Sequence, residues 1–351
     1  MAKRLNCAVI GYGGMGSWHV KFIQSFKFLK LSGIYDIKPT RCALAESNGI
    51  HVYPSLKKLL ADPTLDLVII ATPNHVHKKI ALAALAAGKH VVCEKPVTLN
   101  LRELREIIAA AKKANRLFTV HQNRRWDRDY LITKKIFDTN TLGPIFMIES
   151  RVHGSRGMPS DWRNQMRYGG GIVLDWGVHL LDQILMMTQP RKITSVHAQL
   201  LYVTNENCDD GCRITLTFDD GLRAYVEIGT SNFIELPRWY ICGENGTAIV
   251  RNWACEGEIV KVSDWENRDA VPIVAGAGLT KTMAPRTADT IRRYPLPEVR
   301  AEWSDFYKNV AAHILHGKPA LVTHDQQVRL MTLIETIFAS AKANAVIKCK
   351  I

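Results

Sequence analysis

The sequence has few cysteines and no long apolar segment without charge. Its 351 residues include 8 cysteines, well below the density of a disulfide-stapled domain, and the one closely spaced pair is Cys208 with Cys212. A lone pair without neighbouring histidines is weak evidence for zinc, so we expect free thiols in a reducing compartment. No stretch approaches the roughly 18 uncharged apolar residues of a membrane span, and no signal segment follows Met1. We therefore expect a soluble, cytoplasmic protein with no membrane partner.

Acidic residues are fewer than basic ones. Lys and Arg total 46 against 33 Asp and Glu, which gives a formal net charge of +13. The densest basic cluster, Arg124, Arg125 and Arg128, is interrupted by Trp126 and Asp127, and the other basic residues are scattered. This pattern does not favour a nucleic-acid partner. It favours a basic surface together with a pocket for an anionic cofactor.

The first 120 residues alternate short apolar runs with segments of helical periodicity. Residues 80–87 and 101–114 carry apolar side chains at i, i+3 and i+4 spacing, as amphipathic helices do. Such alternation predicts an α/β fold with a doubly wound parallel sheet. The expected strands are 5–10, 31–35, 51–53 (closed by Pro54), 67–71, 90–93 and 117–120.

After residue 122 the strands follow one another directly. Tight turns at 219–221 and 243–246 separate consecutive strands, so we expect a second domain of the α+β class with a largely antiparallel, open sheet. The charged segment 263–293 is expected to form a surface excursion. We divide the chain into domains 1–122 and 123–351. Expected strands are 145–152, 193–202, 212–218, 222–229, 239–242 and 247–251, and expected helices are 130–137, one ending near 187, 301–316 and 325–345.

A glycine-rich loop directly follows the first expected strand. Residues 11–16 read Gly-Tyr-Gly-Gly-Met-Gly and match G-x-G-x-x-G, with a helical pattern from Ser17. These glycines permit a tight turn, close approach to a pyrophosphate and close packing of the helix on the strand. Asp36 stands 20 residues after Gly16, where an acid accepts hydrogen bonds from the adenosine ribose. We expect NAD, although Lys38 and Arg41 leave NADP open; a purely structural turn is the alternative.

Polar residues also follow the next strands. Residues 71–77, Ala-Thr-Pro-Asn-His-Val-His, come after the fourth expected strand, and Glu94-Lys95-Pro96 come after the fifth. Ligands bind beyond the carboxyl ends of strands in such a sheet, so we expect these loops to face the nicotinamide. Lys95 would there stabilise an alkoxide or polarise a carbonyl. A solvent-facing lysine is equally compatible with the motif.

An acid and a histidine share one face of a helix in the second domain. Asp175 and His179 are four residues apart, and Asp182 extends the same face. The carboxylate would orient the imidazole and favour its protonated form, which makes a proton-transfer pair. A surface i,i+4 pair is the alternative. Neither these three residues nor His75 with His77 form a convincing ligand set, so we expect no metal.

Together the motifs resemble those of the glucose-fructose oxidoreductase and inositol dehydrogenase family (Gfo/Idh/MocA), along essentially the whole chain. The resemblance implies a Rossmann domain, an α+β domain whose open sheet forms homodimer or homotetramer contacts, and an active site between them. It implies that Lys95 contacts the reacting hydroxyl, that His179 is the general base or acid, and that Asp175 orients it and binds substrate. The implied reaction is NAD-dependent oxidation of a secondary hydroxyl of a sugar, cyclitol or derivative, or the reverse reduction.

The binding residues that the resemblance implies fall into two sets. Residues 121–126 read His-Gln-Asn-Arg-Arg-Trp where relatives often read Gly-His-Asn-Arg-Arg-Phe, so the substrate stays open. A redox-assisted lyase, epimerase or glycosidase with internally recycled NAD, and a non-catalytic NAD-binding regulator, remain alternatives. The expected cofactor residues are Gly11, Tyr12, Gly13, Gly14, Met15, Gly16, Asp36, Ile37, Arg41, Ala71, Thr72, Pro73, Asn74, His77, Glu94, Lys95 and Gln122. The expected substrate residues are Asn123, Arg124, His153, Trp162, Arg163, Asp175 and His179.

Overall fold

The computed structural model describes residues 4–266 and 272–351 and begins with a five-stranded parallel sheet. The strand order β2-β1-β3-β4-β5 is that of a doubly wound α/β domain, which confirms the expected fold class. The expected strand at 51–53 is wrong, because only a single bridge joins Val52 to Ile34, and Pro54 has no N–H with which to continue the pairing. The strands are β1 (Leu5–Ile10), β2 (Leu29–Tyr35), β3 (Leu67–Ile70), β4 (His90–Cys93) and β5 (Phe118–Val120).

Helices connect these parallel strands. In α5 the side chain of Asn100 caps the first turn by accepting from the backbone N–H of Glu103, and the buried residues recur at helical spacing from Leu101 to Ala111. The described helices of this domain are α1 (Gly14–Ser25), α2 (Pro39–Ser47), α3 (Leu56–Leu60), the 3-10 turn η1 (Asn74–Val76), α4 (His77–Ala86) and α5 (Leu101–Ala114).

The second domain is built on a nine-stranded sheet of order β15-β12-β11-β10-β6-β9-β8-β7-β16. Its neighbouring strands are antiparallel except β6 and β9, which confirms the largely antiparallel α+β domain. The outer strands β12, β15 and β16 were not predicted. The strands are β6 (Ile145–His153), β7 (Ile193–Leu201), β8 (Gly211–Phe218), β9 (Arg223–Gly229), β10 (Trp239–Gly243), β11 (Gly246–Val250), β12 (Gly257–Val262), β15 (Ile291–Tyr294) and β16 (Ile347–Lys348).

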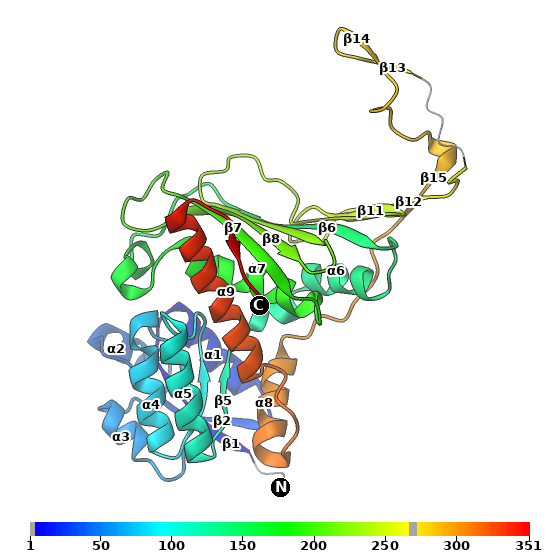
Figure 1. Cartoon of the computed structure of the whole chain (residues 1–351). Coiled ribbons are helices and arrows are strands. Elements are labelled where there is room, and N and C mark those ends of the chain that lie inside the picture. The colour runs from blue at the N-terminus through cyan, green and yellow to red at the C-terminus, as the bar shows by residue number, and fades with distance from the viewer. Residues whose placement is uncertain (1–3, 267–271) are drawn as a thin grey trace.

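Helices α6, α7 and α9 lie on the side of this sheet that faces the first domain (Figure 1). Among them α7 is buried almost all round, which explains its high apolar content. The helical elements are η2 (Asn123–Trp126), α6 (Arg128–Asp138), η3 (Trp162–Asn164), η4 (Met166–Tyr168), the π-helical turn η5 (Val173–Gly177), α7 (Val178–Met187), α8 (Ser304–His316) and α9 (His324–Ala343).

Helix α8 packs against the first domain, although it follows the second domain in the chain (Figure 1). Just before the helix, the Trp303 ring lies 3.8 Å, centroid to centroid, from the Phe22 ring of α1. The division of the chain at residue 122 therefore assigns α8 to the second domain by sequence, although this helix packs against the first domain.

The segment after β12 extends away from the body of the molecule (Figure 1). It contains the two-stranded hairpin β13 (Ile273–Ala275) and β14 (Gly278–Thr280) and the turn η6 (Ala288–Thr290), which agrees with the expected excursion; its residues 267–271 lie outside the described residues. No helix in the described ranges is long and apolar enough to cross a membrane.

Candidate active site

The glycine loop between β1 and α1 has the geometry that a dinucleotide requires. Gly11 has φ +94°, and a Cβ there would lie 2.5 Å from the carbonyl oxygen of Ala71. A Cβ on Gly16 would collide with the carbonyl of Gly11, so this glycine permits close packing of the helix. By contrast, a Cβ on Gly13 or Gly14 would meet nothing within 4 Å, which leaves open space at the helix N-terminus. This cradle fits a pyrophosphate held by backbone N–H groups.

Asp36 lies directly beside this loop. Its carboxylate accepts hydrogen bonds from the backbone nitrogens of Tyr12, at 2.6 Å, and Lys38, at 2.8 Å. The neighbouring Ile37 is 81% exposed, and Arg41 is exposed on α2. These positions fit the adenosine end of a dinucleotide.

The loops after β3 and β4 are tied together from behind. The fully buried ring of His77 lies between two carbonyl oxygens, with Nδ1 3.0 Å from that of Pro96 and Nε2 2.8 Å from that of Thr72. The His77 side chain therefore supports both loops, and its contact with a cofactor stays a prediction. Asn74 donates from Nδ2 to the carbonyl of Gly169 at 2.7 Å and so joins the two domains.

Two buried oxygen atoms near the cofactor loops have no hydrogen-bond partner within the described part of the chain. They are Oγ1 of Thr72 and Oε1 of Gln122. The amide nitrogen of Gln122 donates to Gln327 of α9 at 3.0 Å, an interdomain contact that the sequence did not predict. A buried polar atom without a hydrogen-bond partner costs free energy of folding. These two oxygens are therefore suited to accept hydrogen bonds from a bound ligand.

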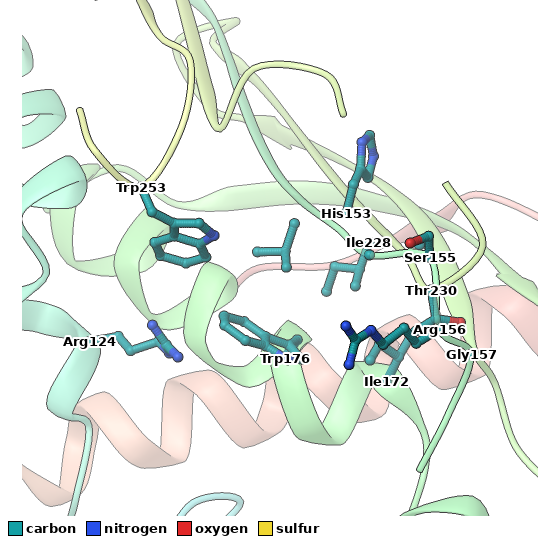
Figure 2. Close-up of a pocket in the computed structure, with 13 residues that line it drawn as sticks. Arg124, His153, Ser155, Arg156, Gly157, Ile172, Trp176, Ile228, Thr230 and Trp253 are labelled. Atoms are coloured by element: carbon teal, nitrogen blue, oxygen red, sulfur yellow. The ribbon is translucent and has the colours of Figure 1, made fainter. Parts of the chain in front are cut away.

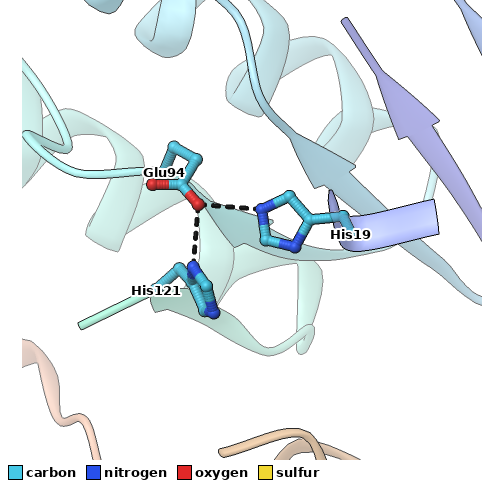
Figure 3. Close-up of side chains that lie close together, drawn as sticks. All are labelled: His19, Glu94 and His121. Carbon is cyan, nitrogen blue, oxygen red and sulfur yellow. Dashed lines mark hydrogen bonds and ion pairs between the residues drawn. The ribbon is translucent and has the colours of Figure 1, made fainter. Parts of the chain in front are cut away.

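Glu94 lies in a buried cluster with two histidines (Figure 3). One oxygen, Oε1, is 2.8 Å from Nε2 of His19 and 2.7 Å from Nδ1 of His121, and the hydroxyl of Tyr307 lies 2.5 Å from the other nitrogen of His19. The second oxygen accepts from the backbone nitrogen of Lys95 at 3.2 Å. Burial raises the pKa of Glu94, but the charge and hydrogen bonds of His121 and His19 outweigh it and hold this pKa well below its usual range.

This cluster gives Glu94 a position behind the Lys95 loop rather than at its surface. The three side chains could in principle ligate a metal ion, since their ligand atoms lie within 4.8 Å of one another. The ring nitrogens that face Glu94 are already used in hydrogen bonds, which explains the cluster without an ion. His19 could have been suspected from the sequence, because it shares the buried face of α1 with Gly16, Val20 and Ile23.

Lys95 and Asp175 join the two domains at the candidate catalytic centre. Nζ of Lys95 donates to the carboxylate of Asp175 at 3.0 Å and to its backbone carbonyl at 2.8 Å. Nε of Arg163 lies 3.7 Å from the same carboxylate oxygen. Burial raises the pKa of Asp175, but the charges of Lys95 and Arg163 and the Lys95 hydrogen bond lower it overall. The peptide bond between Lys95 and Pro96 is cis.

His179 is buried on α7, and Trp176 lies near its ring edge with 6.0 Å between centroids. Its Nδ1 has no hydrogen-bond partner among the described residues. The expected orienting bond from Asp175 is wrong, because Asp175 lies in the π-helical turn before α7, where its carboxylate pairs with Lys95. Burial and the charges of Lys95 and Arg124 hold the pKa of His179 well below its usual value, the opposite direction to the expected effect of a neighbouring carboxylate. A lowered pKa favours the neutral form of this imidazole, which can accept a proton.

Asp182 does not extend the Asp175 and His179 pair. Its two carboxylate oxygens each accept from the buried guanidinium of Arg125 at 2.7 Å. This bidentate pair joins η2 to α7 and has a structural role.

A cavity of about 520 Å³ opens in the second domain beside this centre (Figure 2). Trp176 follows Asp175 in the chain and forms part of the wall, with Arg124 and Trp253. The guanidinium carbon of Arg124 is 4.2 Å from the Trp176 ring centroid and 5.4 Å from that of Trp253, within cation–π range. His153 also lines the cavity, and its buried Nε2 has no hydrogen-bond partner among the described residues.

The predicted substrate residues divide into two groups. Arg124 and His153 line the cavity, whereas Asn123, Trp162, Arg163, Asp175 and His179 do not; Asp175 and His179 belong to the centre beside it. The Arg163 guanidinium stacks 4.6 Å from the ring centroid of Trp162 and reaches Asp175 from η3. Sequence reasoning missed the other residues that line the cavity, among them Arg156, Trp176 and Trp253.

Comparisons with known proteins agree with both domains. Residues 5–122 match the family model described as oxidoreductase family, NAD-binding Rossmann fold. Residues 130–249 match the GFO/IDH/MocA C-terminal domain. These two matches cover the glycine loop, Lys95, Asp175, His179 and most of the cavity wall.

Individual relatives extend the likeness to the whole chain. The crystal structure of an NAD-binding protein from Listeria innocua is 43% identical with a TM-score of 0.94, over 99% of this chain and 100% of the other. The scyllo-inositol 2-dehydrogenase (NADP(+)) IolW of Bacillus subtilis is 27% identical over 96% of this chain and 94% of its own length. The uncharacterized oxidoreductase YdgJ of Escherichia coli is 37% identical, and the match spans 57% of this chain and 58% of the relative. The chain therefore belongs to the Gfo/Idh/MocA oxidoreductases, and its first domain is an NAD-binding Rossmann domain.

Proposed function

We propose that the protein is an NAD-dependent dehydrogenase that oxidises a secondary hydroxyl of a sugar, cyclitol or sugar derivative, or reduces the corresponding ketone. The observation that carries this proposal is the convergence of Lys95, Asp175 and the buried His179, whose pKa is lowered, beside a cavity of about 520 Å³. Such a volume suits one sugar ring. The name of the relative IolW, a scyllo-inositol 2-dehydrogenase, supports a cyclitol as one candidate.

The cofactor would be held along the edge where the Rossmann strands end. The N–H groups at Gly13 and Gly14 would bind the pyrophosphate, and Asp36 would accept from the adenosine ribose. The unpaired Thr72 hydroxyl and Gln122 carbonyl are free to bind polar groups of the nicotinamide half. When bound, NAD supplies the hydride acceptor of the reaction.

The side chains would divide the remaining chemistry between them. His179, neutral because its pKa is lowered, would take the proton of the substrate hydroxyl on its imidazole. The Lys95 ammonium would stabilise the negative charge that develops on the same oxygen. Asp175 would hold Lys95 in place through the 3.0 Å ion pair and would accept from a neighbouring substrate hydroxyl.

The test follows nicotinamide absorbance with NAD, and then with NADP, on a panel of inositols, pyranoses, sugar acids and glycosides. We expect reduction with at least one polyol, and a loss of most turnover in His179→Ala with unchanged NAD binding. The matched control His316→Ala, at the exposed end of α8, should keep the wild-type rate. Wild-type turnover in His179→Ala would refute the assigned base. NAD that stays bound after purification, with no net NADH on any substrate, would instead favour internal recycling of the cofactor.

We also propose that two or more copies associate through the C-terminal sheet. The helices α6, α7 and α9 lie on one side of this sheet, and Phe146 on β6 is 52% exposed (Figure 1). Light scattering of the purified chain tests the association, and a monomer at micromolar concentration would refute it.

A further inference from the structure

The walls of the cavity carry positive charge without an acidic residue. Arg124 and Arg156 are among its lining residues, and none of the described lining residues is Asp or Glu. The third basic residue of the wall, His153, adds no such charge near pH 7, because burial lowers the pKa of its imidazole. Neutral sugars are commonly bound by mixed donors and acceptors, and carboxylates are good acceptors for sugar hydroxyls. Two guanidinium groups in a wall without a carboxylate instead favour a ligand that carries negative charge.

Arg156 is the charged side chain of the cavity wall that no carboxylate of the described residues neutralises. It is exposed in the loop after β6, and the described residues place no carboxylate within ion-pair distance of it. In Figure 2 its guanidinium points toward the side of the cavity that Trp176 forms. A loop arginine without a partner on its own chain gains most from pairing when a ligand supplies the anion.

The other basic groups near the cavity are partly neutralised, and this shows where an anion would be placed. Arg124 donates from Nη1 to Asp127 at 2.8 Å, but its buried Nε has no partner in the described ranges. Glu227, which lies 3.9 Å from His153, is already bound by Arg151 at 3.3 Å and by Arg213. The unbalanced positive charge is therefore at Arg156, with the Nε group of Arg124 as a second donor on the other side of Trp176.

Aromatic rings complete the cavity on the side of Arg124. The ring centroids of Trp176 and Trp253 lie 5.9 Å apart at an interplanar angle of 49°. Such rings cover the apolar C–H face of a sugar while its substituents reach polar groups at the rim. Trp176 also neighbours Asp175 and His179, so a ring bound here extends toward the candidate catalytic centre.

We propose that the substrate is an acidic polyol, a sugar or cyclitol with a carboxylate or phosphate substituent, and that Arg156 binds this anionic group. The proposal rests on the dehydrogenase function proposed above and adds the charge class of its substrate. The planar guanidinium donates two parallel hydrogen bonds to a carboxylate or a phosphate, which a lysine ammonium cannot do in the same geometry.

The test measures binding with matched acidic and neutral ligands. The protein is titrated with D-glucuronate and its neutral methyl ester, then with glucose 6-phosphate and glucose, and binding is followed by quenching of tryptophan fluorescence. This signal reports on the cavity because Trp176 and Trp253 form part of its wall. We expect at least one acid to bind roughly tenfold or more tightly than its neutral counterpart. This preference should weaken as salt is raised, whereas binding of the neutral ligand should not change. The carboxylate and phosphate pairs show which anion is preferred.

Variants assign the preference to one side chain. Arg156→Gln should lower the affinity for the acid to that for the neutral ligand and leave the neutral ligand and NAD unaffected. Arg156→Lys should retain part of the preference. The control Arg102→Gln removes the same charge from α5 of the Rossmann domain, where the side chain is 83% exposed, and should bind as the wild type does.

Three results would overturn the proposal. They are equal binding of the acid and its neutral counterpart in both pairs by the wild type, failure of every acid to bind, and an equal loss of both ligands in Arg156→Gln. A neutral polyol that is oxidised with no effect of Arg156→Gln on any acid refutes the anionic substrate and leaves the dehydrogenase standing. Preferential binding of an acid without any nicotinamide reduction refutes the dehydrogenase and leaves the anion site standing.

Discussion

Replacing Lys95 by methionine tests the centre of the site, because it keeps an unbranched side chain of similar shape and removes the ammonium group with its charge and hydrogen-bond donors. The side chain of Lys95 is 16% exposed and lies 3.0 Å from Asp175, so its charge acts in a largely desolvated place. Losing one such group that stabilises an oxyanion costs about 2.7–4 kcal/mol, a fall in kcat of about 10²–10³-fold. We expect Lys95→Met to show a loss of this size.

The same substitution should move a pKa. The positive charge of Lys95 is one of the causes, after burial, that lower the pKa of His179. Without this charge the pKa of His179 rises toward its ordinary value, and the acid limb of the kcat/KM profile for oxidation shifts to higher pH.

The assay follows NADH formation from pH 5 to 9, with NAD affinity measured separately by fluorescence. Lys113→Met, an exposed change at the end of α5, is the control and should match the wild type. A rate for Lys95→Met within about threefold of the wild type would refute the assigned role of Lys95. An acid limb that does not move would show that His179 is not the group being titrated.

Three further changes test other parts of the molecule. Asp36→Ser should lower the KM for NADP relative to that for NAD about tenfold or more, because it removes a carboxylate that repels a 2′-phosphate; an unchanged ratio in steady-state kinetics would contradict this. Arg125→Met should lower the free energy of unfolding in urea by about 3–5 kcal/mol, because Asp182 is left buried and unpaired, and adding Asp182→Leu should recover most of the loss; equal stability of both variants would contradict this. His19 and His179 both have lowered pKa values, so the unfolded chain binds more protons than the folded chain below pH 6.5. Stability in urea should therefore level off above about pH 7.5 and fall as the pH drops through about 6.5 toward 5, and a rise would contradict the lowered pKa values of these histidines.

Much of the fold and part of the site could be predicted from local sequence patterns. The spacing of neighbouring residues predicts the glycine loop, Asp36 and the apolar strands, because turn geometry and strand burial depend on residues only a few positions apart. The strand at 51–53 failed because the short run is stopped by Pro54, and β12, β15 and β16 were missed because their apolar patterns are weak.

The hydrogen-bond and ion-pair partners within the site could not be predicted from local sequence patterns. The i,i+4 spacing of Asp175 and His179 suggested a pair, but a π-helical turn and a lysine 80 residues away in the chain decided the partner of Asp175. His19, Glu94 and Tyr307 likewise meet only because α1, β4 and α8 pack together.

The sequence by itself determined the class of each domain, the dinucleotide loop and the residue types that carry the chemistry. The tertiary structure decided that the pKa of His179 is lowered by burial and that Glu94 is held behind Lys95 by two histidines. It also decided that Arg156, Trp176 and Trp253 enclose one cavity with Arg124. The physical reason is that burial and charge pairing depend on distances between atoms far apart in the chain, and these distances exist only once the domains have packed.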